Sequence, residues 1–158
     1  MLEGGLADDP YPRAPAVTAP GPTKACVLLV EDDADVGDMY ALALETRGFM
    51  VERAATAMEA VALGRSLKCE VIVLDIGLPD RSGIHVLTEL GTEPGLPPLT
   101  VLVFSNFDEP HLVQQALDLG AFDYLVKAET TPATLVSVVS RMLTPRPQPS
   151  PFPAEPAR

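Results

Sequence analysis

The chain alternates short, continuously apolar runs with longer segments in which apolar residues recur at helical spacing. Residues 27–30, 71–74 and 100–104 are apolar at nearly every position, as expected for strands that helices cover on both faces. Residues 51–54 and 123–126 are shorter or less apolar runs, which we also predict to be strands. This alternation predicts a parallel sheet whose strands are connected by helices.

Five helices are predicted in the intervening segments, from their apolar spacing and from the residues at their ends. They cover residues 34–47, 57–68, 83 to about 90, 109–119 and 132 to about 142. Asp33 is the expected N-cap of the first helix. Thr56 and Glu59 match a capping box before the second helix, and Thr131 followed by Pro132 matches an N-cap with proline at N1 before the last.

Five strands and five helices in alternation predict a doubly wound α/β fold with the flavodoxin-like strand order 2-1-3-4-5. Residues 24–143 form this unit. Residues 1–23 and 144–158 contain eleven of the seventeen prolines and too few large apolar side chains to fold, so we predict two proline-rich disordered tails.

Composition narrows the possible functions. The net charge of −11 argues against direct binding of nucleic acid, whose affinity depends on Lys and Arg at the phosphates. No run approaches the roughly 20 apolar residues that span a bilayer, and the first residues lack the pattern of a secretory signal. Cys26 and Cys69 lack the CxxC spacing of a redox or zinc site and are predicted to be buried free thiols. We therefore expect a cytoplasmic protein with no membrane contact.

Polar residues follow four of the five predicted strands. Glu31 and Asp32 follow the first strand and Asp75 the third, while Ser105 ends the fourth and Lys127 follows the fifth. In the order 2-1-3-4-5 these four strands are neighbours, and ligands bind at the carboxyl ends of such sheets. The sequence therefore predicts a cation and phosphoryl site at this edge.

The chemistry of these side chains supports that prediction. Carboxylates as close as Glu31, Asp32 and Asp75 would raise one another's pKa unless a cation lies between them, and Mg²⁺ prefers oxygen ligands of this kind. Lys127 and Ser105 suit phosphoryl oxygens. A carboxylate that attacks phosphorus forms an acyl phosphate.

With these residues, the segment 24–143 resembles the receiver domains of two-component response regulators. The resemblance rests on the acids after the first strand, on Asp75 followed by Ile76-Gly77-Leu78-Pro79, on Gly83, Ser105, Tyr124 and Lys127, and on the intervals between them. It implies that Asp75 is the phosphoacceptor, which takes its phosphoryl group from a sensor histidine kinase or a histidine phosphotransfer protein.

The resemblance also implies roles for the surrounding residues. Asp32, Asp75 and the backbone carbonyl of Gly77 would bind Mg²⁺ directly, with Glu31 acting mostly through water. Ser105 and Lys127 would bind the phosphoryl oxygens.

Signal output is implied by the same resemblance. Tyr124 matches the aromatic switch position, whose ring reorients as Ser105 moves toward the phosphoryl group. The signal would reach a downstream protein through the face made by the fourth helix, fifth strand and fifth helix. Because only a proline-rich segment follows Met142, we expect a stand-alone regulator. It would not be an enzyme, and would promote only its own phosphotransfer and autodephosphorylation.

Two positions depart from the family pattern. Many receivers have proline after the lysine, but here Ala128 follows Lys127, so the isomer of that peptide bond is left open. Asn106 and Phe107 follow Ser105, and we hypothesise that they partly shield the acyl phosphate, whereas Gly77 leaves its side more open to water.

Three other interpretations are weighed against this one. A Mg²⁺-dependent phosphohydrolase of the haloacid dehalogenase type would need a second Asp two residues after Asp75, where this chain has Gly77. A nucleotide- or flavin-binding module would need a phosphate-binding loop after the first strand, where the acids of residues 31–35 would repel phosphate. A receiver-like interaction domain that is never phosphorylated would have the same fold.

Overall fold

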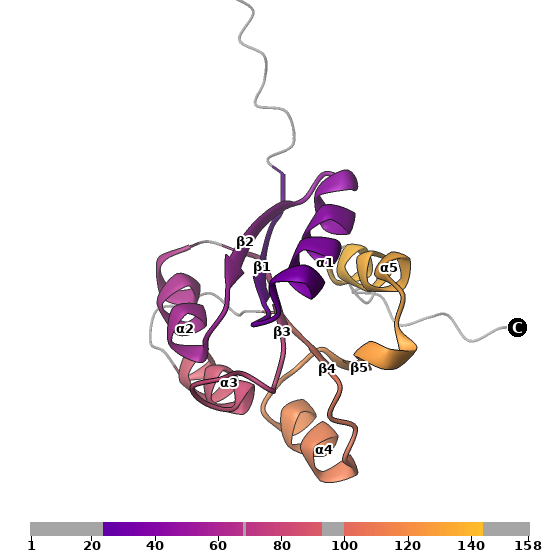
Figure 1. Cartoon of the computed structure of the whole chain (residues 1–158). Helices are drawn as coiled ribbons and strands as arrows, with labels where there is room; N and C mark the ends of the chain where they lie inside the picture. Colours follow the sequence, from indigo (N-terminus) through magenta and orange to yellow (C-terminus); the bar gives the residue numbers. More distant parts are fainter. Residues whose placement is uncertain (1–23, 68, 93–99, 144–158) are drawn as a thin grey trace, which may run out of the picture.

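Five strands and five α-helices alternate along the part of the chain that the structure, a computed structural model, describes: residues 24–67, 69–92 and 100–143 (Figure 1). The strands are β1 (Cys26–Val30), β2 (Met50–Ala54), β3 (Val71–Leu74), β4 (Thr100–Ser105) and β5 (Asp123–Val126). The helices are α1 (Ala34–Thr46), α2 (Ala57–Ser66), α3 (Gly83–Gly91), α4 (Pro110–Asp118) and α5 (Pro132–Leu143), with a single 3₁₀ turn, η1 (Lys127–Glu129), after β5.

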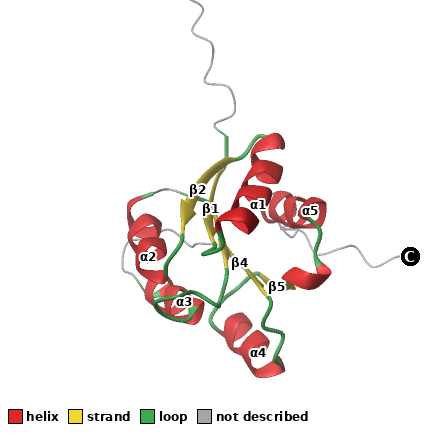
Figure 2. Cartoon of the chain, in the orientation of Figure 1, coloured by secondary structure: helices red, strands yellow, loops and turns green. Residues whose placement is uncertain are grey.

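The strands form one parallel sheet in the order β2-β1-β3-β4-β5, which confirms the predicted fold (Figure 2). β1 is an inner strand, since Val27 pairs with Val51 of β2 on one side and with Val71 of β3 on the other, and β3 is the central strand. The carboxyl ends of β1, β3, β4 and β5 therefore lie along one edge.

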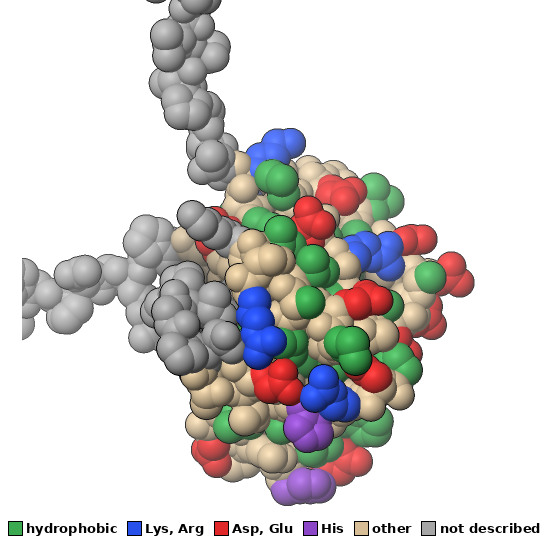
Figure 3. All heavy atoms as spheres, turned by 90° about the vertical axis from the view of Figure 1, so that its left-hand side faces the viewer, with side chains coloured by type: hydrophobic (Ala, Val, Ile, Leu, Met, Phe, Trp, Pro, Cys, Tyr) green, Lys and Arg blue, Asp and Glu red, His purple; other side chains and the backbone are tan. Residues whose placement is uncertain are grey.

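Helices cover both faces of the sheet, and alternate residues of each central strand divide between them. Val27 and Leu29 pack in a core with α1 and α5, whereas Leu28 and Val30 pack in a second core with α2 and α3. All four side chains are at most 2% exposed. Burial on both faces explains why these strands are apolar at every position. Figure 3 shows the surface on the left-hand side of Figure 1, where acidic, basic and apolar side chains are interspersed.

The predicted helix caps are present, with one change of partner. The Asp33 carboxylate accepts hydrogen bonds from the backbone N–H groups of Asp35 and Val36. The Thr56 hydroxyl accepts from the Glu59 N–H at 3.1 Å, but the Glu59 carboxylate bonds the N–H of Ala55 rather than that of Thr56. The Thr56 half of the predicted capping box is thus present, and Glu59 bonds the residue before the N-cap instead of the N-cap itself.

A few details differ from the predictions. α2 ends at Ser66, two residues early, because Leu67 adopts extended backbone angles. The turn η1 was not predicted. All peptide bonds of the described residues are trans, so Lys127–Ala128 is trans. Both predicted tails lie outside the described residues. No helix in the described part of the chain is long and apolar enough to cross a membrane.

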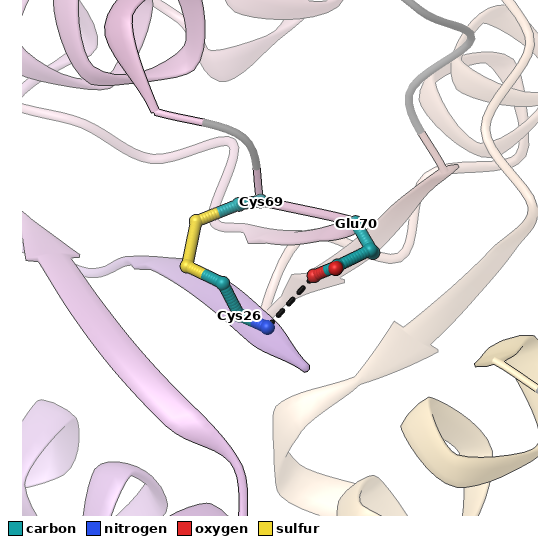
Figure 4. The surroundings of a disulfide bond; sticks show 3 residues. All are labelled: Cys26, Cys69 and Glu70. Atoms are coloured by element: carbon teal, nitrogen blue, oxygen red, sulfur yellow. Dashed lines mark hydrogen bonds between the residues drawn. A yellow bond between two sulfur atoms is a disulfide. The ribbon is translucent and has the colours of Figure 1, made fainter. Parts of the chain in front are cut away.

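The prediction of two free thiols is wrong. Cys26 and Cys69 are joined by a disulfide, with their Cα atoms 4.5 Å apart (Figure 4). Cys26 begins β1, and Cys69 lies two residues before β3. Because β1 and β3 are adjacent and parallel, two cysteines that are 43 residues apart in the sequence become neighbours in space.

Asp80 connects the loop after β3 to the start of α2. Its two carboxylate oxygens accept hydrogen bonds from the N–H groups of Ala57 at 2.8 Å and Met58 at 3.0 Å. These backbone donors, chiefly that of Ala57, lower the pKa of Asp80 below its usual 3.8. A helix N-terminus stabilises a negative charge in this position.

We expect Asp80→Ala to lower the melting temperature at pH 7. Because the folded-state pKa is depressed, the stabilisation is present above pH 3.8 and is lost as the pH falls through the folded-state pKa. Thermal unfolding from pH 7 to pH 3 should therefore show the two proteins converging at the acid end. Glu52→Ala, which removes an exposed carboxylate on β2, is the control. A constant difference at all pH values would contradict the role of the Asp80 charge.

Candidate functional site

Three carboxylates meet at the carboxyl ends of β1 and β3. Glu31, Asp32 and Asp75 each place a carboxylate oxygen within 4.8 Å of the others. The sheet fixes this arrangement, because the backbone N–H of Asp75 donates to the carbonyl of Val30 at 3.1 Å. Glu31 and Asp75 are 6% and 7% exposed, whereas Asp32 is exposed. The cluster thus has a buried side and a side that faces solvent.

Lys127 joins the two buried acids. Its Nζ donates to Oδ2 of Asp75 at 2.8 Å and also to Oε2 of Glu31. Lys127 follows β5, which β4 separates from β3, and its side chain reaches across with Nζ 5.8 Å from the centre of the Phe104 ring. The side chain is 12% exposed, so one buried positive charge lies between two buried negative charges.

The pKa shifts follow from this burial. Burial raises the pKa of Glu31 above its usual value and outweighs the hydrogen bonds from Lys127 and from the Asp33 N–H. Burial alone would lower the pKa of Lys127, but the hydrogen bonds and charges of Asp75 and Glu31 more than compensate, so its pKa is raised. Lys127 therefore stays positively charged at neutral pH.

Glu31 and Asp32, the first two acids after β1, differ in how far their carboxylate oxygens are already engaged by hydrogen-bond donors. Oε2 of Glu31 accepts from Lys127, and its Oε1 accepts from the N–H of Asp33 at 3.2 Å. The Asp32 side chain is exposed. Asp32 is therefore the better placed of the two to bind a ligand directly.

Two glycines shape the loop after β3. The N–H of Gly77 donates to Oδ1 of Asp75 at 3.0 Å, and this hydrogen bond helps to orient the carboxylate. A Cβ atom on Gly83 would lie 2.3 Å from the backbone carbonyl oxygen of Asp75. Gly83 thus permits α3 to begin directly against the end of β3, and any larger residue would displace the site.

Ser105 and Tyr124 meet through the backbone of Phe107. Ser105 is fully buried, and its Oγ accepts from the Phe107 N–H at 3.3 Å. The Tyr124 hydroxyl donates to the Phe107 carbonyl oxygen. Burial raises the pKa of Tyr124, partly offset by a hydrogen bond with Ser105. Sequence patterns did not predict this link, because it depends on the backbone path between β4 and α4.

The Phe107 side chain covers Gly77. A Cβ atom built on Gly77 would lie 2.7 Å from the Phe107 ring. The residue Phe107 is 45% exposed. The loop after β4 thus lies over the loop after β3, next to Asp75.

The structure therefore brings the predicted site residues to one edge of the sheet. Glu31, Asp32, Asp75 and Lys127 form one cluster, with Gly77 bonded to Asp75. Ser105 ends the neighbouring strand β4 and bonds the backbone of Phe107 rather than the acids. All three possible metal ligands in the cluster are carboxylates, which suit a hard divalent cation such as Mg²⁺.

Comparison with known proteins agrees with this fold. Residues 27–140 match the family model described as the response regulator receiver domain. The chain therefore belongs to the response regulator receiver domain family, whose members act in two-component signal transduction.

Several relatives and solved structures are similar to this chain. The probable transcriptional regulatory protein TcrX of Mycobacterium tuberculosis is 35% identical over 117 residues, which are 73% of this chain and 47% of that protein. The KDP operon transcriptional regulatory protein KdpE of Escherichia coli is 37% identical over 101 residues, 64% of this chain and 44% of that protein. The chain thus spans less than half the length of either regulator.

The structure of the chemotaxis response regulator CheY4 of Vibrio cholerae superposes with a TM-score of 0.70 at 28% identity. The superposition covers 77% of this chain and 100% of that one. The described fold therefore corresponds to a complete CheY4 chain.

Lys127→Met tests how far the site depends on one positive charge. Removing one partner of a buried ion pair leaves the other charge uncompensated, so we expect a loss of about 3 kcal/mol in the free energy of unfolding at pH 7.5. Urea unfolding measures it. Lys127→Arg should retain most of the stability, and Asp75→Asn should recover part of the loss in Lys127→Met. If Asp75→Asn made Lys127→Met still less stable, charge repulsion could not be the cause.

Proposed function

We propose that Asp75 accepts a phosphoryl group from a phosphohistidine on a sensor histidine kinase or a histidine phosphotransfer protein. The observation that carries the proposal is the Lys127 amine, which bonds both Asp75 and Glu31 beside the exposed Asp32. A carboxylate that can act as nucleophile is thus bonded to a positive charge, and an exposed acidic ligand, Asp32, lies within 4.8 Å of that carboxylate. Phosphoryl transfer needs mainly positioning and neutralisation of charge.

The residues divide the reaction between them. An oxygen of Asp75 attacks phosphorus, the bond between phosphorus and the histidine nitrogen breaks, and the nitrogen keeps the electron pair. Lys127 turns its N–H donors from Asp75 toward the incoming phosphoryl oxygens, and the Ser105 hydroxyl donates to another. The product is an acyl phosphate on Asp75. The protein promotes this transfer and the later hydrolysis on itself alone, so it is not an enzyme for an external substrate.

Mg²⁺ fits the acidic cluster as the cofactor of this reaction. Asp32, Asp75 and the backbone carbonyl of Gly77 would hold it, with Glu31 acting through water because its oxygens already bond Lys127 and the Asp33 N–H. When bound, the ion neutralises negative charge on the phosphoryl oxygens.

Signal output would begin at Ser105. When its hydroxyl turns to a phosphoryl oxygen, the Phe107 N–H loses its present acceptor, and the loop that also holds the Tyr124 hydroxyl must adjust. Tyr124 is then the switch residue that carries the change to the face formed by α4, β5 and α5, where a downstream protein would bind.

Amide chemical shifts on the face formed by α4, β5 and α5 should move on phosphorylation in the wild type. If Tyr124→Ala showed the same shifts, the switch role would be wrong.

The donor protein would dock beside the site. A groove between α1 and α5 is lined by Met39, Leu42, Pro132 and Val136, with Met39 and Leu42 47% and 65% exposed. α1 begins directly after the acids at 31–33, and α5 begins just after η1, which contains Lys127, so the groove between the two helices lies next to the site.

We also propose that the reaction takes place in the cytoplasm, where histidine kinases use ATP.

The first experiment is phosphorylation by acetyl phosphate, followed by intact mass. We expect one added phosphoryl group with Mg²⁺, none with EDTA, and none on Asp75→Asn. Asp108→Asn, which changes an exposed carboxylate between β4 and α4 that does not belong to the cluster, should be labelled like the wild type. No label under conditions that phosphorylate another receiver would favour the alternative, an interaction domain that is not phosphorylated.

Phe107 is expected to slow loss of the phosphoryl group. Because its ring lies over Gly77 next to Asp75, Phe107→Ala should admit water and speed dephosphorylation about three- to tenfold, or roughly 0.6–1.4 kcal/mol in the barrier. Asn106→Ala should have a smaller effect in the same direction. Phe122→Ala, at another partly exposed phenylalanine, is the control. Unchanged decay of the phosphorylated Asn106→Ala and Phe107→Ala proteins would exclude shielding.

A further inference from the structure

Two sulfur atoms lie at the amino ends of the same strands that carry the acids at their carboxyl ends. Cys26 is the first residue of β1, and Cys69 precedes β3. Figure 4 shows the disulfide between them, beside Glu70. This feature has no part in the phosphoryl chemistry at the opposite edge of the sheet.

The backbone holds the two cysteines together independently of the sulfur–sulfur bond. The N–H of Glu70 donates to the carbonyl of Cys26 at 3.1 Å, and the Glu70 carboxylate accepts from the N–H of Cys26 at 2.7 Å. From there the ladder continues with Val27 opposite Val71. The folded sheet thus keeps Cys26 next to Cys69 whether or not the bond exists, which gives the two thiols a high effective concentration.

The fold also has enough other stabilisation to survive without the bond. Both faces of the sheet are buried by helices, and Cys69 packs in the larger of two extensive apolar cores. Domains of this size do not normally require a disulfide to fold. Loss of the bond would therefore leave two neighbouring thiols in a folded protein.

The two sulfurs differ in access. Cys69 is 5% exposed, whereas Cys26 is half-buried at the start of an otherwise buried strand. An external thiol or disulfide can therefore reach Cys26 more readily than Cys69. This asymmetry suits a pair in which one thiol reacts with the reagent and the other resolves the mixed disulfide.

We propose that Cys26 and Cys69 form a reversible thiol–disulfide couple that clamps the amino ends of β1 and β3. The oxidant is a small disulfide such as oxidised glutathione. The Cys26 thiolate attacks one of its sulfurs and releases one glutathione thiol, and the Cys69 thiolate then attacks the Cys26 sulfur and releases the second. The two cysteines lose two protons and two electrons, and the oxidant becomes two thiols. Excess reduced glutathione reverses both steps.

The clamp acts on the stability of the fold. The bond closes a loop with a sequence separation of 43 residues, which restricts the unfolded chain and stabilises the folded state relative to it. For a domain of this size we expect the oxidised protein to melt about 5–15 °C above the reduced protein.

The test equilibrates the full-length folded chain with mixtures of reduced and oxidised glutathione, then alkylates free thiols under denaturing conditions. Intact mass should show a single transition between a form with two alkyl groups and a form with none, reached from both directions. Melting curves of the two forms should differ by the shift given above. Cys26→Ser/Cys69→Ala is the control, whose melting temperature should not respond to the reagent.

Single variants test the order of the steps. Cys69→Ala, which retains Cys26, should form a mixed disulfide with glutathione faster than Cys26→Ser, which retains Cys69. Two thiols that stay alkylatable in excess oxidised glutathione would overturn the proposal. So would a bond that excess reduced glutathione cannot break while the chain is folded. Neither readout involves phosphorylation, so these outcomes are independent of the role of Asp75.

Discussion

The site depends on the contact of one buried amine with two buried carboxylates. Without Lys127, the strand order would bring Glu31 and Asp75 together with only repulsion between them. With it, each of the two carboxylates accepts a hydrogen bond from a group of opposite charge. The contact also joins the ends of three strands, since β1, β3 and β5 each contribute one of its members. The same interaction therefore orders the edge of the sheet and holds the carboxylate of the proposed nucleophile in place.

The proposed switch would connect chemistry at Asp75 to the neighbouring loop through hydrogen bonds. A phosphoryl group on Asp75 would compete for the donors of Lys127 and offer new acceptors to Ser105. The Ser105 hydroxyl is tied to the Phe107 backbone, and the Phe107 carbonyl is tied to Tyr124. A change of partner at Ser105 would affect its neighbours, because Ser105 is fully buried and the Phe107 N–H that it now accepts from would need another acceptor. The coupling that we propose would be a chain of alternative hydrogen bonds rather than a hinge.

Much of this could be predicted from the sequence, for reasons that differ between features. The strands and their order follow from apolar runs that only a sheet covered on both faces explains, and the acids and Lys127 follow from their places at strand ends. The Phe107 link and the Asp80 contact with α2 depend on loop conformations that leave no periodic signal. The disulfide is a different case. Once β1 and β3 are predicted to be neighbours, Cys26 and Cys69 fall at the same edge, so the signal was present, but the absence of a CxxC motif was given more weight.

β1 and β3 have cysteines at or just before their amino ends and carboxylates just after their carboxyl ends, and the two groups do not touch. From Cys26 to Glu31 the chain is extended and spans about 17 Å. The side chains of residues 27–30 are buried on both faces of the sheet, and the backbone of β1 is paired with β2 on one side and with β3 on the other. Separation of β1 from β3 at the cysteines could therefore disturb the carboxylates only if the whole strand pair came apart. A close-packed core also resists a small, gradual displacement of β1 along its length. A sulfur–sulfur bond at one end can thus change how often the strands open without changing where the acids lie at the other. The proposed redox couple and the proposed phosphoryl chemistry would therefore be independent of each other, because they lie at opposite ends of the same two strands.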